Sequence, residues 1–366
     1  MYTHFSEDIR FAEDPHIVIE QPDFSGLEDL YRGRELCFGD FHVHSDSGGK
    51  SDGKTTPVQW LQAMEALKLD FVGLMDHKQV RHMYLDSFDP NRFVCGTEPA
   101  GKWVDPDVKF HYLMIVPERE CLVRVLEQFP DVFEFTGGTE GTFVYNKIEK
   151  ARFLEVAQAV RAEGGVMIHA HPKQLMDRDD PTDYWFGEGS AIEIIYALQT
   201  RQVLNPDTVN NYKLWMQLLE RDCRTIQTAT SDCHTQPDNA ALNALYVPQK
   251  NGKTYVEYLR KGELNTGFLG LQMAVEACPM GSVIKYRPHM QLQIRLGDIH
   301  PAHDQAGERY RLDVLTDRGM AYSGEFRLPF RVALQVQDRK FYRAVVIRCS
   351  DGTPAAIGNP IWLEKE

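Results

Sequence analysis

The sequence predicts an α/β barrel followed by a C-terminal module built only from β-strands. From about residue 38, short apolar runs alternate with longer helical patterns, which is typical of βα units with a largely parallel sheet. From His289 onward, alternating polar and apolar residues broken by Gly, Asp and Pro indicate short antiparallel strands. The length of 366 residues fits one large domain and a smaller one, because single α/β barrels commonly have about 250 residues.

The first βα unit is well marked. FGDFHV at 38–43 is the first predicted strand, and DFVGLM at 70–75 is the second. Between them, Thr55 and Thr56 supply an N-cap and Pro57 fits a first helical turn. Apolar residues recur at every third position after this start, as on the buried side of a helix: Val58, Leu61, Met64 and Leu67.

Further strands and helices follow in alternation. The strands are RFVCGT, FHYLMIV, GGVMIHA, AIEIIY and RTIQTAT, and the helices lie near 147–163 and 206–221. Asn205 and Pro206 open the second helix. We therefore expect an N-terminal extension at 1–37 that packs on the barrel, the barrel at 38–284, and a β-sandwich-like module at 285–366.

Composition excludes several classes of protein. A formal net charge of −13 disfavours nucleic-acid polymers, whose non-specific binding depends on Lys and Arg. No apolar run approaches the roughly 20 residues that cross a bilayer, and the N-terminus lacks the features of a signal peptide. The seven cysteines are odd in number and never form CxxC, which indicates free thiols in a reducing compartment. We expect a cytoplasmic protein that does not bind membranes.

Histidines and carboxylates collect where the predicted strands end. In α/β barrels these ends meet on one face, where active sites are assembled. His42 and His44 are two apart on one strand, so both side chains point the same way. The remaining members of this set follow later strands: Asp76, His77, Glu98, His171, Asp232 and His234. Imidazole and carboxylate are ligands of zinc, manganese and iron(II), so the pattern predicts a metal centre in which Glu98 bridges two ions.

The motifs resemble the polymerase and histidinol phosphatase (PHP) superfamily of metallohydrolases in order and approximate spacing. The motifs that carry the resemblance are HVHSDSGGKSDG, LMDH, GTE, FHYLMIV, GGVMIHAHP and SDCH. The segments ELNTGFLG, PMGSVI and AIGNPIWL resemble the branch called CehA/McbA-like metallohydrolases. The resemblance implies a distorted (β/α)7 barrel of PHP type with a C-terminal all-β module.

The resemblance also implies which residues hold the ions. His42, His44, Glu98 and Asp232 match the ligands of a first ion, and Glu98 with His111 and His171 matches a second. Asp52, His77 and His234 match a third, with Asp52 standing where some members have His. His111 opens its apolar run instead of closing it, and a reversed strand or a long loop would resolve this. The implied cofactors are two to three divalent ions, Zn, Mn or Fe.

Several other residues near these motifs are each compatible with two roles. Lys78, Arg81 and Lys173 follow ligand motifs closely enough to bind an anionic substrate, and each is also compatible with ordinary surface charge. Asp40 and Glu193 either orient ligand histidines or are structural carboxylates. For His169 a packed or hydrogen-bonded role is favoured.

The sequence thus predicts a metal-dependent hydrolase acting on a small, anionic molecule. The leading hypothesis is hydrolysis of a phosphoester through a metal-bridging hydroxide, with Glu98 and Asp232 bridging ions or positioning the nucleophile. Two alternatives remain: a carbamate or carboxylic ester hydrolase with the same metal site, and a non-catalytic metal-binding PHP module. The β module, from about residue 285, is expected to contribute no ligand.

Overall fold

The computed structural model describes residues 4–5, 9–105, 107–144, 146–197, 203–235, 242–303 and 307–365. The chain divides into two compact units. Gly39–Leu242 and Gln249–Arg260 form the first, which we call the α/β unit. Met1–Phe38, Asn243–Pro248 and Lys261–Glu366 form the second, which we call the β unit.

The strands of the α/β unit match the apolar runs of the sequence. They are β1 (Glu35–Val43), β2 (Phe71–Leu74), β3 (Phe93–Thr97), β4 (Ala100–Lys102), β5 (Lys109–Val116), β6 (Val166–Ala170), β7 (Ala191–Tyr196) and β8 (Ile226–Thr230). Most of their residues are buried on both faces, as is usual for a sheet covered by helices.

The order of these strands is β1-β2-β3-β5-β6-β7-β8, with β4 paired to β5. Each neighbouring pair is parallel except those that contain β5, which runs antiparallel to both β3 and β6. His111, near the start of β5, therefore lies opposite Ala170 at the end of β6. The reversed strand places His111 at the edge where the parallel strands end.

Hydrogen bonds also join the two ends of this strand order. Asp232 N donates to His42 O over 3.0 Å, and His44 N donates to Cys233 O over 2.9 Å. Val43 and Cys233 form a parallel bridge. The residues after β8 therefore meet the end of β1, and the arrangement is barrel-like at this edge.

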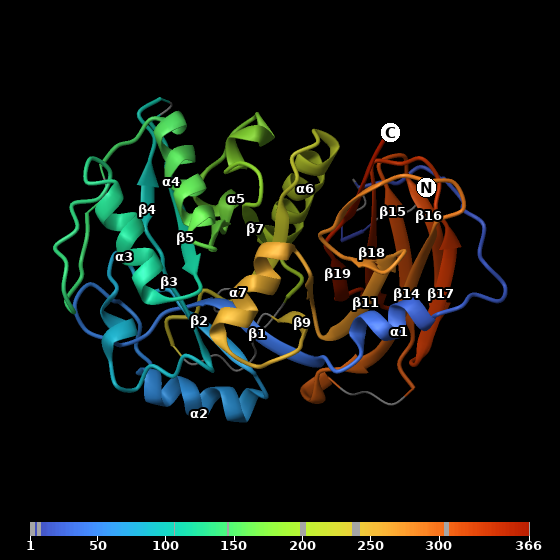
Figure 1. Ribbon diagram of the computed structural model, residues 1–366, viewed down its shortest axis with the longest axis horizontal. Coiled ribbons are helices and arrows are strands. Elements are labelled where there is room, and N and C mark those ends of the chain that lie inside the picture. The colour runs from blue at the N-terminus through green and yellow to red at the C-terminus, as the bar shows by residue number, and fades with distance from the viewer. Residues whose placement is uncertain are drawn as a thin grey trace. The chain divides into compact units, whose positions relative to one another are not determined.

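Helices surround the strands of the α/β unit (Figure 1). They are α2 (Pro57–Leu67), α3 (Arg119–Gln128), α4 (Lys150–Ala162), α5 (Pro172–Leu175), α6 (Pro206–Glu220) and α7 (Gly252–Lys261), with short 3-10 turns at η1 (Arg81–Tyr84) and η2 (Pro181–Tyr184). Thr56 and Gln59 cap α2 reciprocally, as Thr56 and Pro57 in the sequence predict. None of the helices within the described residues is long and apolar enough to cross a lipid bilayer.

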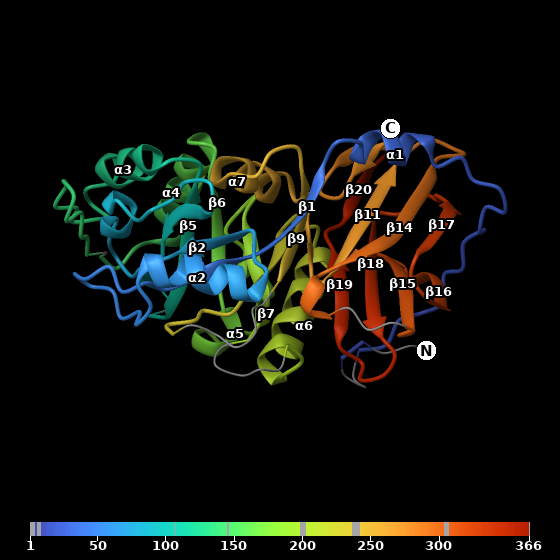
Figure 2. The ribbon, with the colours of Figure 1, turned by 90° about the horizontal axis from the view of Figure 1, so that it is seen from below.

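The β unit contains two sheets, drawn mostly in orange and red in Figure 2. Within this unit one sheet has the order β13-β20-β18-β19-β10-β9, with β15 beside β18 and β16 beside β15, and the other has the order β12-β11-β14-β17. An added Cβ at Gly358 of β19 would lie 2.7 Å from Leu271 Cδ2 of β11, so the sheets pack closely there. The pairs are antiparallel except β13 with β20.

The elements of this unit come from three parts of the chain. They are α1 (Ser25–Tyr31), β9 (Asn243–Val247), β10 (Asn265–Thr266), β11 (Leu269–Val275), β12 (Cys278–Pro279), β13 (Val283–Lys285), β14 (Gln291–Ile299), η3 (Pro301–His303), β15 (Tyr310–Thr316), β16 (Met320–Phe326), β17 (Phe330–Gln335), β18 (Phe341–Arg348), β19 (Pro354–Gly358) and β20 (Ile361–Glu364).

The N-terminal segment pairs with strands of the β unit. Its described residues belong to the β unit, where Glu13 bridges Met320 and Val18 bridges Leu334. Leu27 of α1 is completely buried in a cluster with Ala274 and Ala333. The β unit also takes in residues 261–284, which precede the predicted boundary at 285. Apolar residues at 9–31 and 269–275 complete the core of the β unit. No change in composition marks these residues as part of that core.

Candidate metal centre

The structure brings together all nine residues that the sequence singles out as ligands. Most follow the ends of strands, whereas His111 lies near the start of β5 and Asp52 in the loop after β1. The nine residues fall into three groups, within each of which the ligand atoms lie within 4.8 Å of one another. The groups are His42, His44, Glu98 and Asp232; Glu98, His111 and His171; and His44, Asp52, His77 and His234.

Glu98 connects two of these groups. Its Oε1 lies 3.0 Å from His111 Nδ1 and 3.2 Å from His171 Nε2. Its Oε2 lies 3.3 Å from His42 Nε2 and 3.2 Å from His44 Nε2. The carboxylate is completely buried. Each oxygen thus faces a different set of imidazole nitrogens, as expected of a carboxylate that bridges two ions.

Asp232 completes the group formed with His42 and His44. Its Oδ1 lies 3.3 Å from His42 Nε2 and 3.0 Å from His44 Nε2. The residue has a φ of 47°, a left-handed backbone that is uncommon outside glycine. This turn follows β8 directly and orients the carboxylate toward β1.

The third group is the more exposed one. His234 Nε2 lies 3.3 Å from Asp52 Oδ1, and His77 Nε2 lies 3.7 Å from Asp52 Oδ2. The Asp52 side chain is 54% exposed, whereas that of Glu98 is 1% exposed. An ion held here would keep more contact with solvent than an ion beside Glu98.

The donor atoms of the centre fit divalent cations. His42 Nε2 and His44 Nε2 lie 3.2 Å apart, so two imidazole nitrogens converge on the same carboxylates. Within the described residues, Glu98 Oε2 is buried without a hydrogen-bond partner. Buried polar atoms normally have such partners, and a bound ion would supply them. Imidazole and carboxylate suit zinc, manganese and iron(II).

The electrostatics of the centre show the same need for positive charge. Burial alone would lower the pKa of His42, but the carboxylates of Glu98, Glu193 and Asp232 raise it well above its ordinary value. Burial would raise the pKa of Glu98, but His42, His111 and His171 hold it well below its ordinary range. Protonated imidazole thus compensates the buried carboxylates when cations do not.

Two further carboxylates hold the ligands in place. Glu193 Oε1 lies 2.9 Å from His42 Nδ1, and its Oε2 accepts a 2.7 Å hydrogen bond from His171 N. Asp40 accepts hydrogen bonds from His42 N and Ser231 N over 3.0 and 2.9 Å. Both carboxylates therefore orient histidines of the centre, which is one of the two roles that the sequence left open for them.

The other residues discussed from the sequence have clear positions. His169 is buried against Phe186, with ring centroids 4.5 Å apart, and its Nδ1 lies 3.1 Å from Tyr184 O. This is the packed role favoured above. The Cys233 side chain is buried. Within the described part of the β unit, no histidine joins any of the three ligand groups.

The three predicted substrate-binding cations have different surroundings. Arg81 forms an ion pair with Glu140. Lys173 Nζ lies 3.1 Å from Asp177 Oδ1, four residues further along the chain. Lys78 directly follows the ligand His77 and is partly buried. Its surroundings differ most from those of an ordinary surface lysine.

Sequence reasoning missed two polar residues beside the ligands. Tyr196 ends β7, and its hydroxyl lies 3.1 Å from Asp232 Oδ2 and 3.0 Å from Gln174 Oε1. Gln79 is completely buried and donates to Ser47 Oγ over 2.9 Å and Gly48 O over 3.0 Å. The strand-end position of Tyr196 was the available signal. No pattern in the sequence marks Gln79, because its partners lie in a loop.

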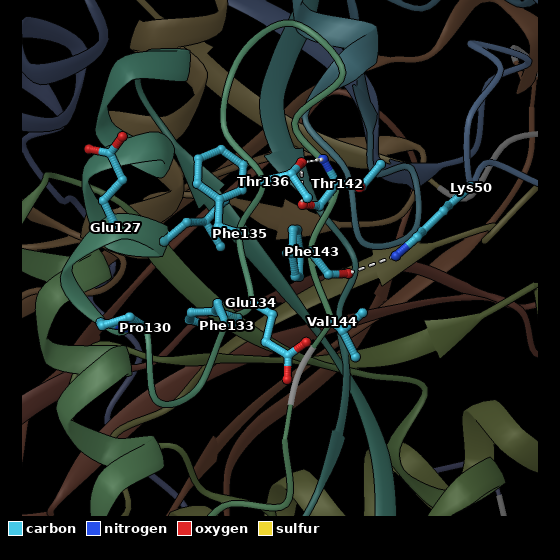
Figure 3. A pocket seen from close by; sticks show the side chains of 11 residues that line it. Lys50, Glu127, Pro130, Phe133, Glu134, Phe135, Thr136, Thr142, Phe143 and Val144 are labelled. Atoms are coloured by element: carbon cyan, nitrogen blue, oxygen red, sulfur yellow. Dashed lines mark hydrogen bonds between the residues drawn. The ribbon is translucent and has the colours of Figure 1, made fainter.

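A pocket with a volume of about 610 Å³ lies beside one edge of the α/β unit (Figure 3). Its charged lining residues are Lys50, Glu127 and Glu134. The rest of the lining is mostly apolar and includes Leu126, Pro130, Phe133, Phe135, Phe143 and Val144. Phe143 N donates to Lys78 O over 3.0 Å, so one wall of the pocket is bound to the segment that follows His77.

Comparison with protein-family models gave no match, and comparison with curated proteins gave none either. Solved structures do show similarity. A two-domain protein from Bacteroides vulgatus, containing a predicted PHP-like metal-dependent phosphoesterase, is 14% identical with a TM-score of 0.40; the match covers 96% of this chain and 99% of that one.

Two other structures match part of the chain. An amidohydrolase from Chromobacterium violaceum, with bound sulfate and no metal, is 15% identical with a TM-score of 0.37, over 55% of this chain and 89% of that one. The lesion-specific endonuclease PfuEndoQ from Pyrococcus furiosus is 14% identical with a TM-score of 0.42, over 62% and 56%. All three TM-scores are below 0.5, so the proposals below rest on the residues of the site.

Proposed function

We propose that this chain is a metal-dependent hydrolase of the PHP superfamily and that it cleaves small phosphoesters. The observation that carries the proposal is the position of Glu98, whose two oxygens face two different groups of imidazole nitrogens. Two divalent ions bound to such groups supply an activated water and stabilise negative charge on the reacting oxygens. The CehA/McbA-like branch is part of the proposal through the sequence resemblance alone.

The chain's own residues have distinct tasks in this proposal. Glu98 bridges the two inner groups, and His42, His44 and Asp232 hold one ion, while His111 and His171 hold the other with Glu98. Glu193 orients His42 and fixes the backbone of His171. Asp52, His77 and His234 bind a third ion in contact with solvent. Zn, Mn and Fe all suit these donors.

The attacking group does not come from a side chain in this proposal. The Ser45 and Ser47 hydroxyls, in the loop that follows His44, both donate to Asp76. Cys233 is buried, and burial raises the pKa of its thiol to about 12. In this proposal water is the nucleophile, and the residues of the centre position it.

The test is a screen of reconstituted protein. Chain purified without chelator and then loaded with Zn, Mn or Fe is assayed against phosphomonoesters, phosphodiesters, aryl carbamates and carboxylic esters. We expect at least two ions per chain by elemental analysis and turnover of phosphomonoesters. Turnover of carbamates or carboxylic esters alone would replace the phosphoesterase proposal by the second hydrolase hypothesis. Fewer than one ion per chain would refute the metal centre.

Variants separate catalysis from folding. Glu98→Ala and Asp232→Ala should each abolish turnover and lower the metal content, with an unchanged circular dichroism spectrum. Glu65→Ala is the matched control, because it removes an exposed carboxylate of α2 that pairs with Arg92. Metal binding without turnover of any substrate in the wild type would favour a non-catalytic metal-binding module.

A further inference from the structure

A chain of polar groups leads from the metal centre to an exposed amide. The Tyr196 hydroxyl lies 3.1 Å from Asp232 Oδ2 and 3.0 Å from Gln174 Oε1. Asp232 Oδ2 also lies 3.8 Å from His171 Nε2, and the ring centroids of Tyr196 and His171 are 5.1 Å apart. Tyr196 and Asp232 are buried, whereas Gln174 is exposed. Gln174 is therefore the solvent-facing end of a chain that begins at a ligand.

The fold fixes the place of this amide. Gln174 is on α5, the short helix that directly follows the ligand His171. Gln174 N donates to His171 O over 3.1 Å, and residues three apart within one helical turn lie on the same side. Figures 1 and 2 show α5 beside β7, the strand that ends at Tyr196. Gln174 is thus held next to both His171 and Tyr196.

The chemistry of the chain assigns its protons. A phenolic hydroxyl has one proton, and a carboxylate that binds a metal is ionised and can only accept. The Tyr196 hydroxyl therefore donates to Asp232 Oδ2, and its own oxygen becomes an acceptor. Two acceptors that face each other repel, so the Gln174 amide has its nitrogen toward Tyr196. A half-turn of the amide achieves this with almost no change in shape.

This assignment leaves an acceptor at the exposed end of the chain. With Nε2 donating to the Tyr196 hydroxyl, Gln174 Oε1 points away from Tyr196. Within the part of the chain that the structure describes, the amide has no hydrogen-bond partner other than Tyr196. Leu175, the next residue of α5, is 37% exposed, so apolar surface adjoins the amide. An acceptor beside an exposed apolar side chain suits a carbon chain that ends in a hydrogen-bond donor.

We propose that Gln174 Oε1 accepts a hydrogen bond from the leaving group of the substrate. This rests on the proposed function and specifies its substrate class. The substrate is then a phosphoester whose leaving group carries a hydroxyl or an amine a few bonds from the ester oxygen. The Gln174 amide is two hydrogen-bond contacts away from Asp232 Oδ2, so a short carbon chain spans from the ions to it.

The test compares four alkyl phosphates that differ at the end of the chain. 3-Hydroxypropyl phosphate and 3-aminopropyl phosphate carry donors, 3-methoxypropyl phosphate carries only an acceptor, and butyl phosphate carries neither. The readout is the ratio of kcat/KM for each polar substrate to kcat/KM for butyl phosphate. A ratio removes effects of metal loading, and of Asp232 positioning, that act on all four substrates.

We expect Gln174→Met, which keeps the side-chain length and removes its polar atoms, to lower the ratio for a donor substrate. The loss should be about 2- to 12-fold for a hydroxyl, as for one hydrogen bond between uncharged groups, and larger for an ammonium. The substrate with the larger loss tells which donor is bound. The ratio for the methoxy substrate should not fall. Gln62→Met, at an exposed glutamine of α2, is the matched control and should alter no ratio.

The two proposals fail in different ways. Hydrolysis with unchanged ratios in Gln174→Met would mean that Gln174 acts only through Tyr196, and a fall for the methoxy substrate would mean that the amide donates. Either result refutes this inference and leaves the phosphoesterase proposal intact.

If no substrate is hydrolysed, calorimetric titration of the metal-loaded chain with 4-hydroxybutylphosphonate, 4-aminobutylphosphonate and pentylphosphonate decides the question, because binding requires no turnover. Equal dissociation constants would refute the role of Gln174. Tighter binding of a donor analogue that Gln174→Met abolishes would support it.

Discussion

At the scale of single residues, the centre depends on groups that hold the ligands as much as on the ligands. Asp232 faces the histidines with Oδ1 and Tyr196 with Oδ2. Asp232 is nearly buried, so its second oxygen has few other partners. The Tyr196 hydroxyl therefore fixes the rotation of the carboxylate, and we assign it a positioning role.

Tyr196→Phe removes the hydroxyl and with it the contacts to Asp232 Oδ2 and Gln174 Oε1. A hydrogen bond to a charged group contributes about 1.5 to 3 kcal/mol, so we expect kcat to fall roughly 10- to 150-fold with little change in KM. Metal content should stay near that of wild type. Tyr322→Phe, in the β unit, is the control. A rise in KM with unchanged kcat would instead place Tyr196 at the substrate.

That several histidines meet in one place could be predicted at this scale, because strand ends are visible in the sequence. His42, His44 and His171 each end an apolar run, and parallel strands converge at that edge. Glu193 is on a predicted strand, but its partners His42 and His171 lie 151 and 22 positions away, so its role required the fold. Arg81 was predicted to bind substrate because it lies close to His77 in sequence. That closeness does not indicate that Arg81 pairs with Glu140.

At the scale of elements, the loop between β1 and α2 is held by buried side chains. Asp76 accepts hydrogen bonds from Ser45 N and Oγ over 2.6 and 2.8 Å. Gln79 Oε1 accepts from Lys50 N over 2.7 Å, and its amide donates to Ser47 Oγ. This loop carries both Asp52 and Lys50, so Gln79 positions the exposed part of the centre.

Gln79→Leu keeps the volume but leaves Lys50 N and Ser47 Oγ without their partner. We expect the exposed ion to be lost first, so that metal content falls by about one ion while the ions at Glu98 remain. The free energy of unfolding should drop by about 1 to 3 kcal/mol, because buried polar groups lose partners. Gln79→Glu, which retains the acceptor for Lys50 N, should lose less. Elemental analysis and urea unfolding measure both effects, and loss of all ions together would contradict the assignment.

The apolar runs in the sequence predict the strands but not the direction of every strand. The alternation of runs predicts parallel strands, and β1, β2, β3, β6, β7 and β8 follow it. In the sequence only His111 indicates that β5 is reversed. This polar residue begins its apolar run, whereas on a parallel strand a residue of the site would end the run. Strand direction depends on the connections, here the short β4 paired with the start of β5, and these have no periodic signal.

At the scale of the whole molecule, residues far apart in sequence complete each unit. Asp14 lies 2.7 and 2.5 Å from the Arg339 guanidinium, 325 positions away, within the β unit. From the sequence we expected the N-terminal extension, residues 1–37, to pack on the barrel. Its pairing with β16 and β17 depends on backbone hydrogen bonds, which any sequence of suitable shape can form.

The Asp14 pair predicts a pH-dependent contribution to stability. Hydrogen bonds from Arg339 lower the pKa of Asp14 to about 2. A depressed carboxyl pKa stabilises the fold above the unfolded-state pKa of about 4 and loses that contribution as pH falls toward 2. Asp14→Asn should therefore cost about 2 kcal/mol at pH 7 and progressively less below pH 4. Urea unfolding at several pH values measures this, with Asp29→Asn, an exposed partner of Arg32, as control. A cost independent of pH would point to shape instead of charge.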